Sequence, residues 1–256
     1  MIFYFSATGN SKYVTERISK CVDYNESMIA ITDCMKQEKF SFIVEEEALV
    51  GIVSPVYGWG LPSIVREFLE KLELSYSVKP YTYFVATYGT STGQIGAYAN
   101  EIIKKKSLFF DAYYSIKMPD TWTPVFDLSD ISKVAAINER SELQLIEVIQ
   151  NIDQRKHGDF IKHKIPRFAA NIESAYYENK MRCTKHFHVE NSCIGCGLCQ
   201  NKCPASAIEL HNGLPVWVKD KCIMCLGCLH RCPKFSIQYG KSTKKHGQYI
   251  NPNVKI

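Results

Sequence analysis

Eight of the eleven cysteines in this 256-residue chain lie between Cys193 and Cys232. They form two runs with the same spacing, C-x2-C-x2-C-x3-C-P, and the second run starts 29 residues after the first. The runs consist of Cys193, Cys196, Cys199 and Cys203, and of Cys222, Cys225, Cys228 and Cys232. Within each run the spacing lets three thiolates of one tight loop reach three irons of a cubane, while the fourth cysteine points to the other cluster. The residues therefore predict two [4Fe–4S] clusters.

Because the fourth cysteines cross over, we expect each cluster to draw ligands from both runs. One cluster is expected on Cys193, Cys196, Cys199 and Cys232, and the other on Cys222, Cys225, Cys228 and Cys203. Gly195, Gly197 and Gly227 allow backbone amides to approach the cluster sulfides. Zinc is the alternative, because CxxC pairs also occur in zinc ribbons, but those use two pairs for each metal.

Residues 186–240 resemble a bacterial two-cluster ferredoxin, and all eight ligand positions match. Between the two runs, Ala207–Leu210 and Leu214–Val218 flank Asn212-Gly213, which predicts a β-hairpin, as the resemblance also implies. The clustering of the cysteines indicates metal in a reducing compartment rather than the disulfides of a secreted protein.

A second set of residues that could do chemistry lies near the N-terminus. The segment Phe5–Ser11 (FSATGNS) connects an apolar run to a helical pattern, and it contains no lysine or arginine. Hydroxyls and backbone amides at a helix N-terminus can hold a phosphate dianion. The segment resembles the flavodoxin phosphate loop, which implies that Ser6, Thr8, Asn10 and Ser11 hold the phosphate of FMN and that Gly9 provides the turn. Taken alone, it also fits a turn rich in helix N-caps.

Two further loops, Ser54–Pro62 and Thr87–Gly93, are rich in glycine, proline, aromatic or hydroxyl residues and follow apolar strands. The flavodoxin resemblance implies that both flank the flavin ring, with Tyr57 or Trp59 stacking on it and Gly58 contacting N5. The FMN-contacting residues expected here are Pro55, Val56, Tyr57, Gly58, Trp59, Thr87, Tyr88, Gly89 and Gly93. Residues 118–124 follow the last strand; they either cover the flavin or form the domain junction, or they are only a structural turn.

The elements that position these loops alternate between strand and helix. Expected strands are Met1–Phe5, Ile29–Ile31 (weaker), Ala48–Val53, Tyr81–Thr87 and Phe109–Met118; expected helices are Ser11–Cys21, Ser63–Leu72, a segment ending near Lys105, and Ile131–Ile152. This alternation predicts a parallel sheet. The resemblance implies a flavodoxin-like doubly wound α/β sheet in the order 2-1-3-4-5, plus a small α+β ferredoxin-like domain. In that order, the three loops meet at the carboxyl edge of the sheet.

We expect four segments along the chain. They are a flavodoxin-like FMN-binding domain (1–155), a connector (156–185), the ferredoxin-like domain (186–240) and a C-terminal tail (241–256). No apolar run is long enough to span a membrane, and the N-terminus lacks the signal-peptide pattern, so we expect a cytoplasmic protein. The formal charge of +5 falls to about +1 once each thiolate-bound cluster adds roughly −2, so nucleic acid is not an expected partner.

The chain as a whole resembles the flavodoxin–ferredoxin fusion family of anaerobes, although it is not acidic like free flavodoxins. The resemblance implies an electron-transfer protein that links FMN to two clusters, and its partner would be a redox protein or a small-molecule acceptor. The alternative is an FMN-dependent reductase of a quinone, nitro compound or enone, with Tyr57, Tyr88 or Asp120 as proton donor. Gly89-x3-Gly93-x2-Gly96 lacks the dinucleotide-binding spacing, so direct oxidation of a nicotinamide is not expected.

Overall fold

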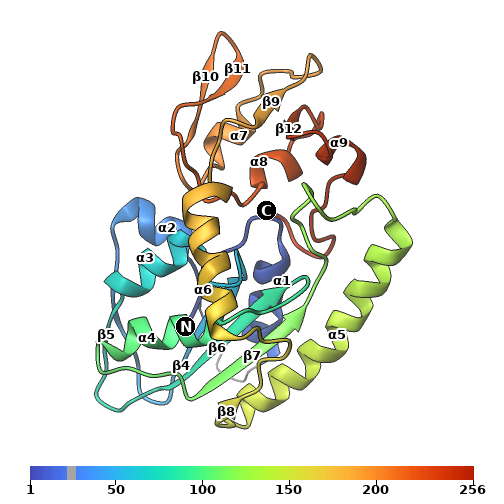
Figure 1. Ribbon diagram of the computed structural model, residues 1–256. Helices are drawn as coiled ribbons and strands as arrows, with labels where there is room; N and C mark the ends of the chain where they lie inside the picture. The colour runs from blue at the N-terminus through green and yellow to red at the C-terminus, as the bar shows by residue number, and fades with distance from the viewer. Residues whose placement is uncertain (22–26) are drawn as a thin grey trace.

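The computed structural model describes residues 1–21 and 27–256. An α/β unit is built around a six-stranded sheet, and a cysteine-rich unit of short strands and helices lies above it (Figure 1). The C-terminus returns to the boundary between the two units (Figure 1). Among the described residues, no helix has the length and apolar character needed to cross a membrane.

The large sheet is parallel throughout. Its order is β2 (Met28–Ala30), β1 (Ile2–Tyr4), β4 (Leu49–Pro55), β6 (Tyr81–Tyr88), β7 (Ala112–Lys117) and β8 (Gly158–Asp159). Each neighbouring pair is parallel. The first five strands therefore have the expected doubly wound order 2-1-3-4-5, and β8 extends the sheet beside β7.

Helices cover both faces of this sheet. One face packs against α1 (Asn10–Cys21) and α5 (Ile131–Asp153), which bury Val14, Ile18 and Leu145 against it. The other face packs against α2 (Ile31–Gln37), α3 (Ser63–Lys71) and α4 (Ile95–Lys104). All eight residues of β6 are buried, as expected for a central strand covered on both sides.

Some elements have no counterpart in the sequence expectations. Ile31 begins α2 instead of ending a strand, and β3 (Ser41–Ile43) pairs with β5 (Glu73–Ser75) in a separate small sheet. The last large strand begins at Ala112 rather than Phe109, because Phe110 turns into the core beside Phe84. These elements span seven residues or fewer, too short for hydrophobic periodicity to identify them.

The segment between the two units is largely helical. After β8, α6 (Arg167–Tyr176) continues into the π-helix η1 (Tyr177–Met181) and runs from the sheet toward the cysteine-rich unit (Figure 1). Tyr177 lies at the start of the π-helix and is buried. π-Helical turns are rare and concentrate at functional sites, and Tyr177 and Met181 of this turn line a cavity.

The cysteine-rich unit is made of two antiparallel strand pairs and two short helices. β9 (Phe187–Val189) pairs with β12 (Ile237–Tyr239), and β10 (Ile208–His211) pairs with β11 (Leu214–Trp217). The β10–β11 turn has Asn212 and Gly213 at positive φ, which confirms the expected hairpin. The helices α7 (Leu198–Asn201) and α8 (Gly227–His230) each carry the third cysteine of one run.

The last sixteen residues fold back onto the α/β unit. After α9 (Thr243–His246), the N–H of Asn251 donates to the carbonyl of Thr8 at 2.8 Å. The N–H of Leu128 donates to the carbonyl of His246, also at 2.8 Å. Residues 241–256 therefore join the cysteine-rich unit to the first loop of the α/β unit.

Candidate functional site: a pocket between the sheet edge and the cysteine-rich unit

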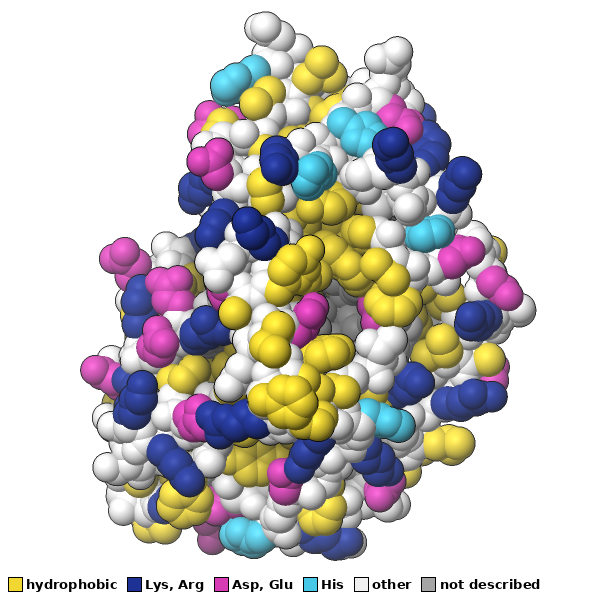
Figure 2. Space-filling model, viewed as in Figure 1, with side chains coloured by type: hydrophobic (Ala, Val, Ile, Leu, Met, Phe, Trp, Pro, Cys, Tyr) yellow, Lys and Arg dark blue, Asp and Glu magenta, His cyan; other side chains and the backbone are white. Residues whose placement is uncertain are grey.

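A cavity of about 350 Å³ opens at the carboxyl edge of the sheet, where β1, β4 and β6 end. Figure 2 shows it as a hollow ringed by hydrophobic side chains, with acidic side chains on its walls. The structure brings twelve of the fourteen expected FMN-contacting residues to this cavity: Ser6, Thr8, Asn10, Ser11, Pro55, Val56, Tyr57, Gly58, Trp59, Thr87, Tyr88 and Gly89. This is the switch point at which open α/β sheets bind ligands.

The other two expected residues, Gly9 and Gly93, shape the loops from outside the cavity. Gly9 has φ +96°, and a Cβ there would lie 2.8 Å from the side chain of Val254 in the C-terminal segment. Gly93 has φ +55° and lies directly against the backbone of Trp59. Both positions require glycine because the backbone is left-handed and the adjacent space is filled.

The first loop leads into α1, whose first turn contains no acidic residue. The Oγ of Ser6 is buried and has no hydrogen-bond partner among the described residues. Ser11 exchanges a hydrogen bond of 2.8 Å with Thr87, which ties the first loop to the third. An unpartnered hydroxyl beside the free amides of a helix N-terminus suits a phosphate group.

Asn10 differs from the other residues of this loop because protein groups already satisfy its side chain. Its Nδ2 donates to the carbonyl of Pro119 at 3.3 Å. Its Oδ1 accepts from the hydroxyl of Tyr249 at 2.9 Å and from Nδ2 of Asn251 at 3.1 Å. The Asn10 side chain therefore anchors the C-terminal segment to the loop, and what it offers to a phosphate is its backbone N–H.

The second loop makes a tight turn at residues 57–60. Tyr57 and Gly60 exchange two backbone hydrogen bonds of 3.0 and 2.9 Å, and Gly58 and Trp59 between them have positive φ. At Gly58, a Cβ would collide with the Cβ of Tyr177 on the π-helix. Burial raises the pKa of Tyr57, so its hydroxyl stays protonated at neutral pH.

The segment after β7 completes one wall of the cavity with Met118, Pro119, Asp120, Thr121 and Trp122. The Asp120 carboxylate lies against Gly89, accepts the N–H of Trp122 at 3.1 Å and accepts from Thr90. Burial nevertheless raises the pKa of Asp120, because it outweighs these hydrogen bonds. The same segment contacts the cysteine-rich unit, so it both covers the cavity and forms the junction.

Sequence reasoning did not identify several residues that line the cavity. Glu173, Tyr177 and Met181 come from α6 and the π-helix, and Met224, Cys225 and Leu226 come from the second cysteine run. The helical residues carry no motif that marks them. Cys225 was expected as a cluster ligand, but nothing in its spacing places it beside the flavodoxin-like loops.

The eight clustered cysteines surround two smaller cavities. One is lined by Cys193, Cys196, Cys199 and Cys232, and the other by Cys203, Cys222, Cys225 and Cys228. We call these the outer and the inner cysteine sites. Each contains three cysteines of one run and the fourth of the other, the arrangement that paired [4Fe–4S] clusters require. Among the described residues, no three histidine, cysteine or acidic side chains close around a single metal ion.

Backbone amides donate to the sulfurs of both sites. The N–H of Ala207 donates to Cys203 Sγ, and the N–H of Ser236 donates to Cys232 Sγ, each at 3.3 Å and four residues along the chain. The N–H of Met224 donates to Cys222 Sγ at 3.2 Å. Such bonds stabilise thiolate ligands and tune the potentials of clusters.

Cys225 contributes to two cavities, because it lines the inner cysteine site and the large cavity at the sheet edge. The point where a Cβ of Gly227 would lie is 3.6 Å from Cys225 Sγ, 3.6 Å from the carbonyl of Ala7 and 3.1 Å from Nη1 of Arg231. The inner site and the first loop are therefore close neighbours. Arg231 lies between them and donates to the carbonyl of Ser6 at 3.4 Å.

A buried histidine fixes the junction of the two units. Nδ1 of His230 accepts the N–H of Tyr249 at 3.1 Å, so Nε2–H is left to donate to the carbonyl of Thr121 at 2.9 Å. Burial lowers the pKa of His230 to about 4, which keeps the ring neutral at pH 7. A second bond across the junction comes from the hydroxyl of Tyr177, which donates to the carbonyl of Ile223 at 2.7 Å.

Solved structures that are similar to this chain include the rubredoxin oxygen:oxidoreductase of Desulfovibrio gigas, at 13% identity and a TM-score of 0.33 over 58% of this chain and 35% of that one. An FMN-dependent NADH-azoreductase of Bacillus anthracis is 9% identical, with a TM-score of 0.36 over 59% and 98%. A flavone reductase is 10% identical, with a TM-score of 0.33 over 85% and 81%. The chain thus spans about a third of the length of the Desulfovibrio protein, and similarity this distant carries no functional argument.

A comparison with curated proteins finds no match. The flavodoxin domain family matches residues 1–143, which is more than half of the chain, and the 4Fe-4S dicluster domain family matches residues 192–237. The first match implies FMN, and the second, with its clustered cysteines, implies [4Fe–4S] clusters. The residues around the cavities suit both groups. The chain therefore belongs to the flavodoxin domain family and is a flavodoxin–ferredoxin fusion.

Proposed function

We propose that this protein transfers electrons between one-electron carriers and a two-electron flavin, and that its two cysteine sites lead to the flavin pocket. An electron-transfer or flavin-linked redox role follows from the two domains. FMN exchanges one or two electrons, and each [4Fe–4S] cluster exchanges one. Fusion of the domains keeps the groups at high effective concentration relative to each other.

The position of Cys225 is the observation that carries this proposal. A ligand of the inner cysteine site also lines the cavity formed by the three flavodoxin-like loops. A fusion of two unrelated electron carriers would not need a shared wall between its two redox sites. The shared wall supports transfer within one chain, without a diffusional encounter.

We assign the residues as follows. Ser6, Thr8 and Ser11 hold the FMN phosphate together with the first amides of α1, and Asn10 contributes its backbone. Tyr57, Gly58, Trp59, Tyr88 and Gly89 flank the flavin ring. The outer cysteine site forms the port to the partner, because Cys196 is exposed and its neighbour Ile194 is 59% exposed, whereas Cys222 in the inner site is buried.

The test is an anaerobic redox titration, with iron, sulfide and FMN measured on the same sample. About eight irons and one FMN per chain, with electrons passing from reduced clusters to the flavin in a stopped-flow mixing experiment, would support the proposal. Clusters that stay reduced beside an oxidised flavin would refute it. Protein without flavin after growth with excess riboflavin would refute the assignment of the loops.

A second candidate is reduction of a small organic substrate such as a quinone, nitro compound or enone. It is favoured by Asp120, a partly buried carboxyl group of raised pKa that lines a cavity edged by Trp122, Val125 and Phe126. A carboxyl group that stays protonated more readily than usual can supply a proton during reduction. Steady turnover with a reduced ferredoxin and one of these substrates would favour this candidate, and lack of turnover across all three classes would favour the carrier.

A further inference from the structure

The two cysteine runs have the same spacing but differ at two backbone positions. We call the first run (Cys193 to Cys203) the outer run and the second (Cys222 to Cys232) the inner run, after the site to which each gives three cysteines. In the outer run, Gly195 and Gly197 have φ of +65° and +75°. The corresponding residues of the inner run, 29 positions later, are Met224 and Leu226, with φ of +55° and +53°. The inner run therefore keeps the left-handed backbone of the outer run but carries two large side chains where glycine would be unstrained.

Left-handed backbone is unfavourable for methionine and leucine because the Cβ crowds the neighbouring carbonyl. Residues held in such conformations occur where the surroundings compensate for the strain, often at functional sites. The outer run leaves no room for a side chain at Gly195, where a Cβ would lie 2.8 Å from the carbonyl of Gly213. The inner run has space at both positions and fills it.

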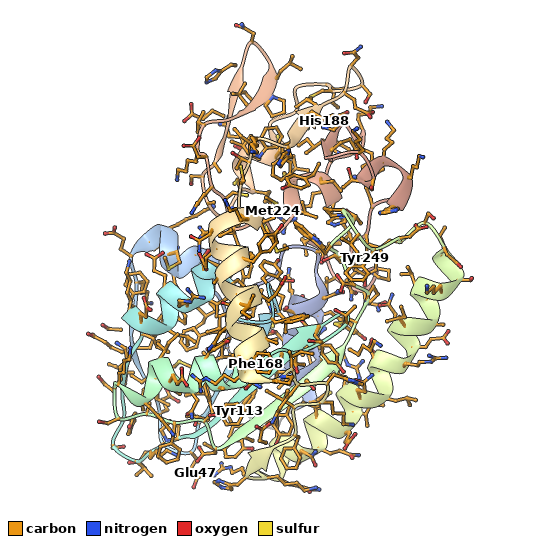
Figure 3. The ribbon with its side chains drawn as sticks, in the orientation of Figure 1. Glu47, Tyr113, Phe168, His188, Met224 and Tyr249 are labelled. Carbon is orange, nitrogen blue, oxygen red and sulfur yellow. The ribbon has the colours of Figure 1, made fainter. Side chains whose placement is uncertain are left out.

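Both residues lie at the flavin pocket. Met224 lines the large cavity, and Leu226 lines both this cavity and the inner cysteine site. Both side chains are buried, with exposures of 3% and 2%. Figure 3 labels Met224 at the boundary between the cysteine-rich unit and the α/β unit, just above α6.

We propose that Met224 and Leu226 form an apolar partition, on either side of Cys225, that seals the inner cysteine site from water and packs against the flavin ring. This inference rests on the proposed function. Exclusion of water strengthens the electrostatic interaction between the two redox sites, because the local dielectric constant falls. It also lets the ring of FMN bury apolar surface against the partition, which adds to FMN affinity.

A purely structural explanation must be separated from this one. Both residues also belong to the small core of the cysteine-rich unit, with Leu229 and Ile237. If they served that core alone, their replacement would weaken folding or cluster retention without changing the affinity of the flavin. A role in the partition instead predicts a weaker affinity for FMN, with folding and iron content unchanged.

The experiment replaces each residue by its counterpart in the outer run, in the full chain with clusters loaded. Met224→Gly and Leu226→Gly remove the side chain and relieve the backbone strain. Phe235→Ser is the matched control. Phe235 has φ +49°, and its counterpart 29 positions earlier, Ser206, has φ +45°. Phe235 does not line the flavin pocket. The measurements are iron content and the dissociation constant of FMN, from flavin fluorescence released on dilution.

We expect Leu226→Gly to raise the FMN dissociation constant roughly tenfold, the loss expected for one buried apolar contact, with iron unchanged. Met224→Gly should act in the same direction, and Phe235→Ser should stay within about twofold of the wild type. Unchanged FMN affinity in both glycine variants would overturn the inference. If a glycine variant loses iron, Leu226→Asn decides, because asparagine tolerates this backbone and has the same branched shape but is polar. A raised FMN dissociation constant in Leu226→Asn protein that retains its iron would support the partition, and an unchanged constant would overturn it.

Failure of this inference differs from failure of the proposed function. The dissociation constant of FMN does not depend on whether electrons move between the sites. If the reduced clusters of the wild-type protein fail to reduce the flavin, the proposed function is wrong. If the wild-type clusters reduce the flavin but the glycine variants leave the FMN dissociation constant unchanged, only the partition is wrong.

Discussion

At the scale of single residues, the site depends on positions where close packing leaves no space for a larger side chain. Gly58 illustrates this, because the turn needs a left-handed residue there and Tyr177 leaves no space for a side chain. We expect Gly58→Ala to lower the free energy of unfolding by several kcal/mol, since backbone strain of about 1–2 kcal/mol adds to an overpacking cost of similar size. FMN content should fall as well, because the turn lines the pocket.

Gly240→Ala is the matched control for that prediction. Gly240 also has a left-handed φ of +63°, but no atom lies within 4 Å of the point where its Cβ would be. It should therefore cost only the strain, about 1–2 kcal/mol, and retain FMN. Equal losses in the two variants, measured by chemical denaturation and flavin content, would show that Tyr177 does not restrict the turn.

Asp120 provides a pH-dependent prediction. Because burial raises its pKa in the folded protein, its protonated form favours folding, and this contribution is lost as the pH rises through the folded pKa. Asp120→Asn keeps the shape without the charge, so it should raise Tm by a few degrees at pH 8 and by less at pH 5.5. A shift of Tm for Asp120→Asn that is equal at the two pH values would contradict the argument.

At the scale of elements, the sequence predicted the strongly periodic parts. The strands that became β4, β6 and β7 lie in longer apolar runs, β1 was found through the short apolar run Met1–Phe5, and the eight cysteines have a spacing that few other sites share. The weaker segments were missed because three-residue strands such as β3 and β5 have no periodicity to detect. The contact of Asn251 with Asn10 joins residues 241 positions apart, and no local pattern encodes such a pair.

That long-range contact makes the C-terminal segment testable. Asn251 orients Asn10 through its side chain and Thr8 through its backbone, so it pre-organises the loop assigned to the phosphate. Asn251→Ala removes a buried hydrogen bond worth about 1 kcal/mol, which corresponds to a roughly fivefold rise in the FMN dissociation constant. Asn253→Ala, at an exposed position of the same segment, should leave the constant unchanged; an equal effect of both would mean that the segment only stabilises the fold.

At the scale of the whole molecule, the outer cysteine site, the inner cysteine site and the flavin pocket follow one another across the two units, in an order that suits electron transfer. The outer cysteine site is the more exposed, the inner site adjoins the flavin pocket, and the buried His230 and Tyr177 hold the units together through Thr121 and Ile223. The geometry therefore predicts an order of use in which an external protein meets the outer site first. Direct exchange at the flavin would require access past the rim formed by Trp122, Val125 and Phe126.

Cys196→Ser tests that order. Loss of one ligand of the outer site should reduce iron from about eight to about four per chain. FMN should be retained, because Cys196 does not line its pocket. Reduction of the flavin by a reduced ferredoxin should slow at least about tenfold, as it loses its entry point, while reduction by the small ion dithionite persists. Cys21→Ser, at an exposed cysteine outside both sites, should change none of these quantities. An unchanged rate with ferredoxin in the iron-depleted Cys196→Ser protein would place the entry point at the inner site or at the flavin itself.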